Sequence, residues 1–271
     1  MKRLLFLSLF AVALSGCELQ GGEPVTRTEI GSGSETRVAL RREVSACEVV
    51  IFEDVPLTHC VADPVKHNIS TVLADPNGTP YRSLKTYGEA LGKDAAVVAF
   101  AMNGGVFEND GKTVGYYVEE GQRLEELNLG DGTGNFYLKP NGVFFGTDGR
   151  WEIRTSTNFL YNVSDRPQFG TQSGPMLVID GQLHPEIQDD GPSKIIRNGV
   201  GIDAEGKAHF VISDGALSFG QLARYFRDEL QTPNALYLDG GISGLWDPVT
   251  ERLDDTNGIG PLIVVTKKVS E

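Results

Sequence analysis

Seven Asp-Gly pairs divide this 271-residue sequence into short segments, and they limit its fold more than any other feature. The pairs begin at Asp110, Asp131, Asp148, Asp180, Asp190, Asp214 and Asp239. Asp-Gly is a strong signal for a tight turn between two strands. Most of these pairs lie between short apolar stretches. The sequence therefore predicts a fold rich in β-sheet.

The apolar stretches between the turn signals are candidate strands. They are 49–52, 69–73, 96–101, 115–118, 136–138, 143–146, 151–154, 176–179, 199–203, 208–213, 235–238 and 262–266. Unbroken apolar runs such as 97–100 and 235–238 are typical of central strands that are buried on both faces.

Two segments carry the signals of helices. One begins at Thr79-Pro80, a capping residue followed by proline at the first helical position. The other begins at Ser218, where Gln221 completes a capping box. Two main helices among many strands, without regular alternation of strand and helix, predict the α+β class. We expect mixed, largely antiparallel sheets.

The N-terminus has the features of an export signal. Lys2 and Arg3 precede an apolar run, 4–14, which is shorter than the roughly 20 residues that span a bilayer. The sequence Leu-Ser-Gly-Cys that ends at Cys17 resembles the bacterial lipobox, in which the cysteine carries a lipid. We expect residues 1–16 to be a lipoprotein signal peptide. The alternative is an ordinary cleaved signal followed by a chance cysteine.

The residues after Cys17 predict a tether to a membrane. Residues 17–42 contain few large apolar side chains and cannot bury enough surface to fold. The domain is expected over 43–271. Glu18, in place of Asp, favours attachment to the outer membrane, facing the periplasm. Loss of Lys2 and Arg3 with the signal changes the formal charge from -13 to -15, which disfavours nucleic acid and anionic lipid as partners.

The other two cysteines are expected to form a disulfide. Cys47 and Cys60 would be exported to an oxidising compartment, where paired thiols become bridged. The alternative is a metal or redox site that uses both thiols with His59.

Several common kinds of active site are missing from the sequence. It has no Gly-x-Gly-x-x-Gly fingerprint, no phosphate loop at Gly111-Lys112-Thr113 and no Gly-x-Ser-x-Gly elbow. Its four histidines lack the paired spacings of zinc sites. Acid-base chemistry would therefore rely on carboxylates, and anion recognition on arginine, lysine and backbone amides.

Four segments place polar residues and glycine beside apolar strands, where loops present chemistry on a rigid scaffold. The first contains Asn103, Gly104 and Gly105, whose amides can approach a ligand oxygen; the alternative is a plain tight turn. In the second, Ser173 can bind a sugar hydroxyl or a phosphate, or simply lie in a turn.

The other two segments carry charge. Arg197 and Asn198 precede a strand, and an arginine can hold phosphate with two parallel hydrogen bonds, although a surface ion pair is the simpler reading. Asp239, followed by Gly240, Gly241 and Ser243, stands at the end of a buried run, where burial can shift its pKa. Asp214 is a possible partner. For both aspartates the alternative is a turn.

The order of these segments resembles the phosphodiester glycosidase family. The matching motifs are Asn-Gly-Gly-Val-Phe at 103–107, Ser-Gly-Pro-Met-Leu at 173–177, Arg-Asn-Gly-Val-Gly at 197–201, Ser-Asp-Gly at 213–215 and Leu-Asp-Gly-Gly-Ile-Ser at 238–243. Val106, Asn198, Ile242 and Gly244 depart from residues common in that family, which puts the identity of the sugar in doubt. The resemblance implies hydrolysis of the bond between a sugar's anomeric carbon and a phosphate, on an envelope glycan or glycolipid.

The resemblance also implies roles for the site residues. Asp239 would act at the anomeric carbon or on the attacking water, and Asp214 would orient sugar hydroxyls or assist. Arg197 and the amides of Gly104 and Gly105 would hold the phosphate, and a divalent cation bound by either aspartate is possible. The alternatives are an envelope lipoprotein that binds glycan without catalysis and a metal-dependent phosphodiesterase.

Overall fold

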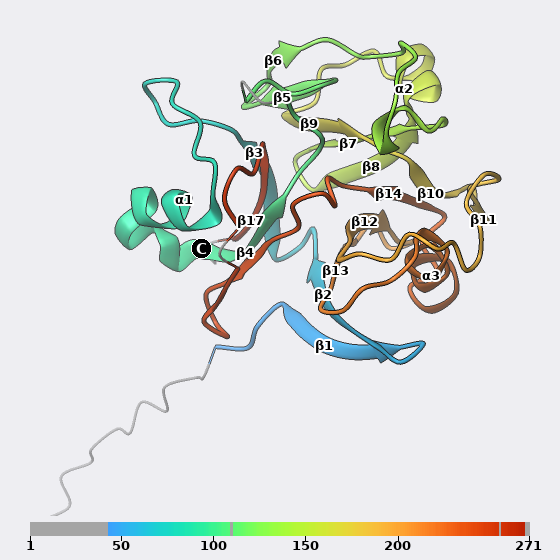
Figure 1. The fold of residues 1–271 in the computed structure, drawn as a ribbon. Helices are drawn as coiled ribbons and strands as arrows, with labels where there is room; N and C mark the ends of the chain where they lie inside the picture. The colour runs from blue at the N-terminus through green and yellow to red at the C-terminus, as the bar shows by residue number, and fades with distance from the viewer. Residues whose placement is uncertain (1–42, 109–110, 255, 269–271) are drawn as a thin grey trace, which may run out of the picture. The chain divides into compact units, whose positions relative to one another are not determined.

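A computed structural model describes residues 43–108, 111–254 and 256–268, in which 17 strands form three sheets (Figure 1). The first sheet contains, in spatial order, β1 (Cys47–Phe52), β2 (Val55–Ala62), β13 (Ala208–Ser213), β12 (Asn198–Ile202), β14 (Asn234–Tyr237), β10 (Met176–Ile179) and β11 (Gln182–Leu183). The second contains β16 (Arg252–Leu253), β15 (Leu245–Asp247), β4 (Val98–Asn103), β17 (Leu262–Lys267) and β3 (His67–Val72). The third contains β6 (Gln122–Glu125), β5 (Tyr117–Glu119), β9 (Phe169–Ser173), β7 (Gly142–Thr147) and β8 (Arg150–Thr155).

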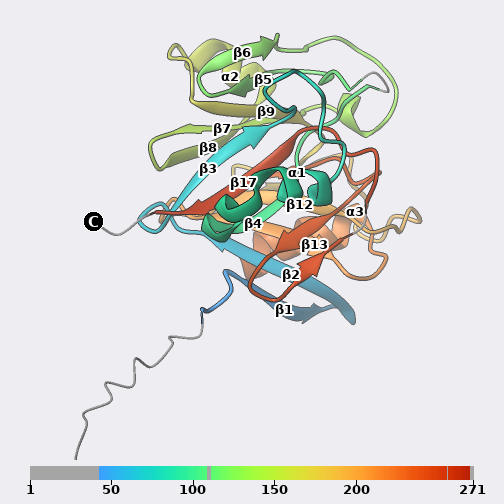
Figure 2. The same cartoon turned by 90° about the vertical axis from the view of Figure 1, so that its left-hand side faces the viewer.

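Three α-helices accompany the sheets. They are α1 (Leu84–Leu91), α2 (Ser156–Asn162) and α3 (Phe219–Arg224), which continues as a short π-helix, η3 (Tyr225–Glu229). Two 3₁₀ turns, η1 (Gly92–Val97) and η2 (Asn135–Tyr137), complete the helical elements that the structure describes. Figure 2 shows α1 lying over β4 and β17. Every described strand pair is antiparallel, so the predicted α+β class with largely antiparallel sheets is confirmed.

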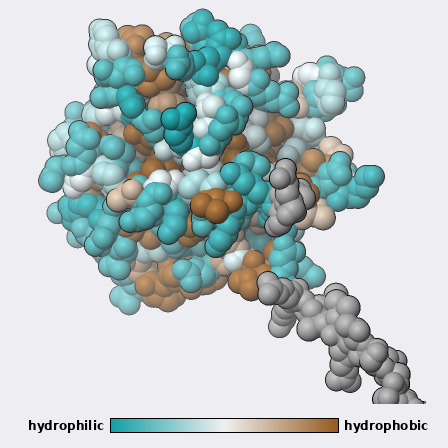
Figure 3. Space-filling model, turned by 180° about the vertical axis from the view of Figure 1, so that it is seen from behind, coloured by the Kyte–Doolittle hydropathy of each residue, from teal (hydrophilic) through white to brown (hydrophobic). Residues whose placement is uncertain are grey.

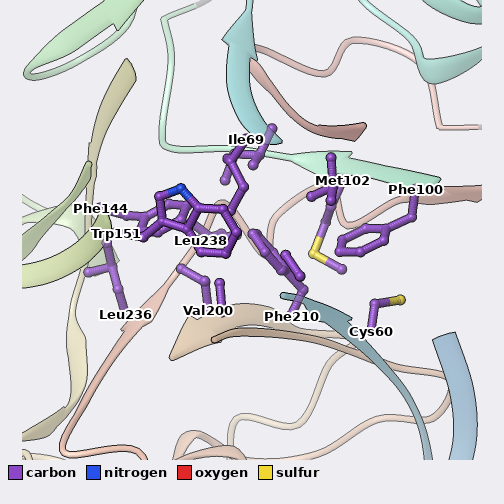
Figure 4. Close-up of a cluster of buried hydrophobic side chains, with 14 of the residues drawn as sticks. Cys60, Ile69, Phe100, Met102, Phe144, Trp151, Val200, Phe210, Leu236 and Leu238 are labelled. Carbon is purple, nitrogen blue, oxygen red and sulfur yellow. The ribbon is translucent and has the colours of Figure 1, made fainter. Parts of the chain in front are cut away.

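The three sheets share one hydrophobic core. Figure 4 shows side chains from all three sheets meeting, among them Phe210 from the first, Phe100 from the second and Phe144 from the third. The rings of Phe100 and Phe144 both pack edge-on against Phe210, with centroids 5.3 and 5.8 Å away. Burial of such side chains stabilises the fold by about 1.5 to 3 kcal/mol each. This core fixes the sheets rigidly beneath the loops that connect them.

The surface of the molecule is largely hydrophilic. Figure 3 shows hydrophilic side chains over most of the face seen from behind, with separate apolar patches between them. Among the described residues, no helix is long and apolar enough to cross a membrane.

Two Asp-Gly pairs form the expected hairpin turns. Asp148-Gly149 joins β7 to β8, and Asp180-Gly181 joins β10 to β11. Both residues of each pair have positive φ, the backbone that the two-residue turn requires. Asp214 and Asp239 do not have positive φ. These two aspartates therefore belong to loops of another kind.

Some predicted boundaries and elements were wrong. The first helix begins after Ser83, whose Oγ accepts a hydrogen bond from Thr86 N at 3.0 Å, and not at Thr79-Pro80. The stretch 136–138 lies in η2 and its C-cap and not in a strand, because Gly134, with φ of 91°, turns the chain directly before it. The capping box at Ser218 is present as predicted.

Cys47 and Cys60 are bridged in the structure. They are directly opposite each other in the register of β1 and β2. The bridge therefore ties the edge strand β1 to its single neighbour in the first sheet. Cys17 lies outside the described residues.

Candidate active site

The predicted segments meet at one edge of the first sheet. Because β12 is antiparallel to β13 and β14, its beginning lies beside the ends of these two neighbours. Ser213 N donates to the Arg197 carbonyl at 2.8 Å, and Leu238 N donates to the Asn198 carbonyl at 3.2 Å. Tyr237 N donates to the Pro175 carbonyl at 3.0 Å, which brings in the segment before β10.

Asn103 joins this edge to the second sheet. Its side chain is 1% exposed, and its Nδ2 donates to the Asp239 carbonyl at 2.8 Å. Its Oδ1 accepts from Asn198 Nδ2 at 2.8 Å and from Gly244 N at 3.0 Å. One buried amide thus fixes the chain on both sides of the Asp239 loop.

The two glycines after Asn103 are needed for close packing. The carbonyl of Gly104 accepts a hydrogen bond from Asp239 N at 3.0 Å. A Cβ atom on Gly105 would lie 2.2 Å from the carbonyl oxygen of Gln172. Glycine therefore lets three segments approach one another closely at these positions.

The amides of Gly104 and Gly105 have acceptors within the protein, which corrects their expected role. Gly104 N donates to the Pro261 carbonyl at 2.7 Å, and Gly105 N donates to Thr171 Oγ1 at 3.2 Å. Neither N–H is free to hold a phosphate. Both glycines instead support the backbone of the Asp239 loop.

Asp239 is partly buried at the end of β14. Among the described residues, its carboxylate accepts one hydrogen bond, from Gly241 N at 3.2 Å, and no cation is paired with it. Burial raises the pKa of Asp239 above that of an ordinary aspartic acid, and the hydrogen bond from Gly241 opposes the shift. Its surroundings therefore differ from those of a carboxylate held in a structural ion pair.

The glycines after Asp239 differ in what they allow. A Cβ atom on Gly240 would lie 1.8 Å from the Tyr237 hydroxyl, whereas one on Gly241 would meet only Asp239 Oδ1, at 3.3 Å. Gly240 therefore permits the loop to rest on Tyr237. Further along the loop, Ser243 Oγ is 3.4 Å from Asn198 Oδ1.

Ser173 is buried beside this loop without a hydrogen-bond partner. Its side chain is 0% exposed, and its Oγ has no partner among the described residues. Ser173 and Thr171 are two apart on β9 and so share a face, and Thr171 Oγ1 contacts Gly105 N. A buried hydroxyl without a partner requires an explanation, and a bound ligand group is one.

Arg197 points into the protein. Its side chain is 0% exposed and stacks on Phe219, with Cζ 3.7 Å from the ring centroid. Its guanidinium donates to Tyr237 Oη at 3.1 Å, to the Leu217 carbonyl at 3.1 Å and to the Ser193 carbonyl at 3.0 Å. The protein thus engages all three guanidinium nitrogens of Arg197, and one of them holds the Tyr237 hydroxyl. The expected role of Arg197 as the phosphate ligand stays a prediction.

Comparison with known proteins decides the relationship. The family model described as Phosphodiester glycosidase matches residues 96–266. The chain belongs to the phosphodiester glycosidase family. The five motifs and the loops that they form all lie within the matched residues.

Individual relatives agree with the family assignment. The chain is 39% identical over 171 residues to the uncharacterized protein YigE of Escherichia coli K12. This match covers 60% of the chain and 66% of YigE, so the chain spans slightly under two thirds of that relative.

Solved structures of this fold are more distant in sequence. The zebrafish N-acetylglucosamine-1-phosphodiester alpha-N-acetylglucosaminidase catalytic domain, auto-inhibited by its pro-peptide, matches with a TM-score of 0.56 at 14% identity over 82% of each chain. A protein of Burkholderia pseudomallei matches with a TM-score of 0.53 at 12% identity, over 78% of this chain and 74% of its own. At these identities the likeness shows the shared fold.

Asp214 differs from Asp239 in its partners. Asp214 Oδ1 is 2.8 Å from Arg252 Nη1, and its Oδ2 accepts from Thr58 Oγ1 at 2.7 Å. It directly follows β13, which is two strands from β14 in the sheet, so the backbones of these two strands are about 10 Å apart. Asp214, although part of the Ser-Asp-Gly motif, is therefore held in an ion pair and a hydrogen bond within the protein, and a contact with substrate stays a prediction.

Sequence reasoning missed two residues of this edge. Arg252, on β16, pairs with Asp214 and with Asp254 at 2.9 Å. Tyr237 lies between Arg197 and Gly240, and burial raises the pKa of its phenol while the charge of Arg197 lowers it. Tyr237 was read as part of an apolar strand. Its position is apparent only in the structure, where a Cβ atom on Gly240 would collide with its hydroxyl and the buried guanidinium of Arg197 donates to that hydroxyl.

The described residues contain no group of three or more His, Cys, Asp or Glu side chains placed to hold a metal ion. Hollows on the described surface include one of about 330 Å³ lined by Trp151, Arg154 and Asp203. It lies at the other end of β12 and β14, away from Asp239. We therefore place the candidate site at the motifs around Asp239 and not in that hollow.

Proposed function

We propose that this protein hydrolyses a sugar 1-phosphodiester at the bond between the anomeric carbon and the phosphate. The observation that carries the proposal is the Asp239 carboxylate. It is partly buried and free of any paired cation among the described residues, at the point where the family's five motifs converge. Membership of the phosphodiester glycosidase family supports this class of reaction, as does the activity named for the zebrafish relative, an N-acetylglucosamine-1-phosphodiester alpha-N-acetylglucosaminidase.

Asp239 is the group that acts at the anomeric carbon or on the attacking water. A base or nucleophile must be ionised, and a carboxyl with a raised pKa is a stronger base once its proton has left. The leaving phosphate is already a weak base and needs little protonation. One carboxylate therefore suffices, whereas most glycosidases place an acid opposite it.

The neighbouring residues hold Asp239 in place and bind the sugar. Asn103 fixes the backbone of Asp239, and Asn198 fixes Asn103. The Ser173 hydroxyl, which has no partner in the described protein, binds a sugar hydroxyl or a phosphate oxygen. Ser243 and the Gly240-Gly241 backbone form the wall on the other side.

The protein acts in the bacterial envelope. The support is the signal sequence that ends at Cys17 and the tether after it. A lipid on Cys17 holds the protein to the outer membrane, facing the periplasm, and the substrate is an envelope glycan or glycolipid. We further propose that a divalent cation binds at Asp214 or Asp239, and removal of the cation with a chelator tests this.

The test is release of free sugar from an α-N-acetylglucosaminyl phosphodiester by the purified protein, with and without a chelator. Asp239→Asn is the variant, and Asp180→Asn, in the hairpin turn after β10, is the matched control. We expect sugar release that the control retains and that Asp239→Asn loses by at least about 100-fold in kcat/KM. Loss of sugar release in the presence of the chelator would show that the reaction requires a divalent metal ion.

The products separate this proposal from its rivals. Free sugar with an intact phosphate monoester supports the glycosidase. Sugar phosphate would identify a phosphodiesterase. If a panel of envelope sugar phosphodiesters were bound but left unchanged, the protein would be a glycan-binding lipoprotein and the proposal would be wrong.

A further inference from the structure

Arg82 is a cation of unusual placement near the site. Its backbone has φ of 60°, a left-handed conformation that costs a residue with a side chain about 1 kcal/mol or more. Its carbonyl accepts two hydrogen bonds, from Gly258 N at 2.9 Å and from Ile259 N at 3.0 Å. The neighbouring loop thus holds Arg82 in a conformation that it would not adopt alone.

The Arg82 side chain rests on an aromatic ring of the first motif. Its Cζ lies 5.1 Å from the centroid of Phe107, a distance at which the ring attracts a cation. Among the described residues, no carboxylate is paired with Arg82. Within the part of the chain that the structure describes, a partly buried arginine with no carboxylate beside it is uncommon in a protein with a formal charge of -13.

Two series of contacts connect Arg82 to the Asp239 loop. In the first series, Gly258 N donates to the Arg82 carbonyl, and Ile242 Cδ1 lies 3.9 Å from the Cβ position of Gly258. Ile242 is three residues after Asp239. The two loops therefore lie side by side.

The second series of contacts passes through the Phe107 ring, on which the Arg82 guanidinium rests. A Cβ atom on Gly260 would lie 2.2 Å from Phe107 Cδ1, so Phe107 packs directly on Gly260. The next residue, Pro261, accepts from Gly104 N at 2.7 Å, and the Gly104 carbonyl accepts from Asp239 N at 3.0 Å. These contacts place the Arg82 segment beside the Asp239 loop, and no ion pair joins the two side chains.

We infer that Arg82, supported by Phe107, binds the negatively charged phosphate of the sugar phosphodiester and so selects charged over neutral glycosides. The inference rests on the proposed function, because it names the group that recognises the substrate of that site. A guanidinium presents parallel N–H donors to the two free oxygens of a phosphodiester. Arg197 is less suited to this contact, since its side chain is 0% exposed and four of its five N–H donors are already bonded inside the protein.

The test compares binding of charged and neutral ligands by the purified protein in isothermal titration calorimetry. The probes are inorganic phosphate, α-N-acetylglucosamine 1-phosphate and methyl α-N-acetylglucosaminide. Arg82→Gln removes the charge, Arg82→Lys keeps it without the fork, and Arg150→Gln removes an exposed arginine from β8 as the matched control.

We expect Arg82→Gln to weaken binding of the phosphate-containing probes by about 10- to 100-fold. Arg82→Lys should be intermediate, and Arg150→Gln should bind like the wild type. Affinity for the neutral glycoside should stay unchanged in all three. If the wild type bound neither phosphate-containing probe, or if Arg82→Gln bound them as the wild type does, the inference would be overturned.

The sugar-release assay keeps this inference separate from the proposed function. Sugar release together with unchanged phosphate affinity in Arg82→Gln would retain the function and overturn the role of Arg82. Phosphate binding that depends on Arg82, without release of sugar from any phosphodiester, would retain the role of Arg82 and overturn the hydrolytic function.

Discussion

At Asp239, function and stability oppose each other. Burial makes the ionised carboxylate less favourable in the folded chain, so the folded pKa lies above the unfolded one. Such a group contributes its stability below the unfolded pKa and loses it as the pH rises through the folded pKa. At neutral pH the ionised Asp239 therefore destabilises the fold. The same burial strengthens it as a base.

Asp239→Asn should therefore be inactive and more stable. Asparagine cannot ionise, so the variant avoids the cost of a buried charge at neutral pH. We expect its free energy of unfolding at pH 7.5 to exceed that of the wild type, and the difference to shrink as the pH falls toward 4. Urea denaturation at several pH values measures this. A variant less stable than the wild type at pH 7.5 would argue for a structural role of the carboxylate.

Gly240 and Gly241 give a second prediction at this scale. A methyl group at Gly240 would collide with the Tyr237 hydroxyl, whereas one at Gly241 would meet only the Asp239 side chain. Gly240→Ala should cost about 1 to 3 kcal/mol and most of the activity, because Tyr237 must move. Gly241→Ala, the control, should cost less than about 0.5 kcal/mol. Equal losses of stability in urea would contradict the packing that the structure shows.

Residue identity was easier to predict from the sequence than side-chain direction. The residues Asn103, Asn198 and Asp239 meet because their strands are adjacent, and motif order alone pointed to them. Arg197 also lies at this edge, but its guanidinium turns inward onto Phe219 and Tyr237. Nothing local to Arg197 determines that direction. It depends on α3, which packs from a distant part of the chain.

At the scale of elements, strands with uniform apolar character were predictable and irregular ones were not. β13 has the predicted bounds, Ala208–Ser213. β9 (Phe169–Ser173) was missed because Gly170, Thr171 and Gln172 have little apolar character, although all three are buried between β5 and β7. The short α2 was missed for a different reason, since only Ser156 and Phe159 of its residues are buried and they form no apolar stripe of helical length.

The β1–β2 hairpin supplies a prediction about an element. Because Cys47 and Cys60 bridge strands that are already paired, the crosslink holds the edge strand to the sheet. Replacing both cysteines with serine should lower the free energy of unfolding by about 3 kcal/mol, as expected for a loop of this length. Amide hydrogen exchange should increase first in β1.

Two comparisons check the origin of that effect. Wild-type protein treated with a reductant should unfold at the same urea concentration as the double serine variant. Amides of β12, in the centre of the sheet, should keep their protection until global unfolding. If β12 and β1 lost protection together, the bridge would be stabilising the whole sheet and not its edge.

At the scale of the whole molecule, the site exists only because two sheets meet. The sequence order of the motifs predicted that they act together. The sequence did not show that Asn103, at the end of β4 in the second sheet, would join Asp239 and Asn198 in the first. Arg82 was overlooked altogether, since it lies outside the motifs. Its position depends on a left-handed backbone and on two amides from residues 258–259.

His59 makes the stability of the molecule depend on pH. His59 on β2 is 7% exposed, and its Nε2 lies 2.9 Å from Nδ1 of His209, which also contacts Asp203. Glu48 lies 3.7 Å away, and the Tyr225 ring covers the other side. Burial, with the charge of His209, lowers the pKa of His59 from 6.5 to about 4.

The sign of this shift predicts acid destabilisation. A histidine with a depressed folded pKa contributes stability above its unfolded pKa of 6.5, and this is lost as the pH falls toward about 4. The loss from His59 alone is about 3 kcal/mol. His59→Gln should therefore be less stable than the wild type at pH 7.5, because the contact with His209 is gone, yet should depend less on pH below 6.5.

Measuring the free energy of unfolding of the wild type and of His59→Gln at each pH separates the effect of His59 from that of the buried carboxylates. Burial raises the pKa of Glu119 and of Asp239, so both groups stabilise the fold as the pH falls and oppose the histidine. These carboxylates are present in both proteins, and their contributions cancel in the difference between the two unfolding free energies. That difference, measured by urea denaturation, should narrow by about 3 kcal/mol between pH 7 and pH 4. A constant difference over this range would mean that His59 is protonated as easily in the folded chain as in the unfolded one.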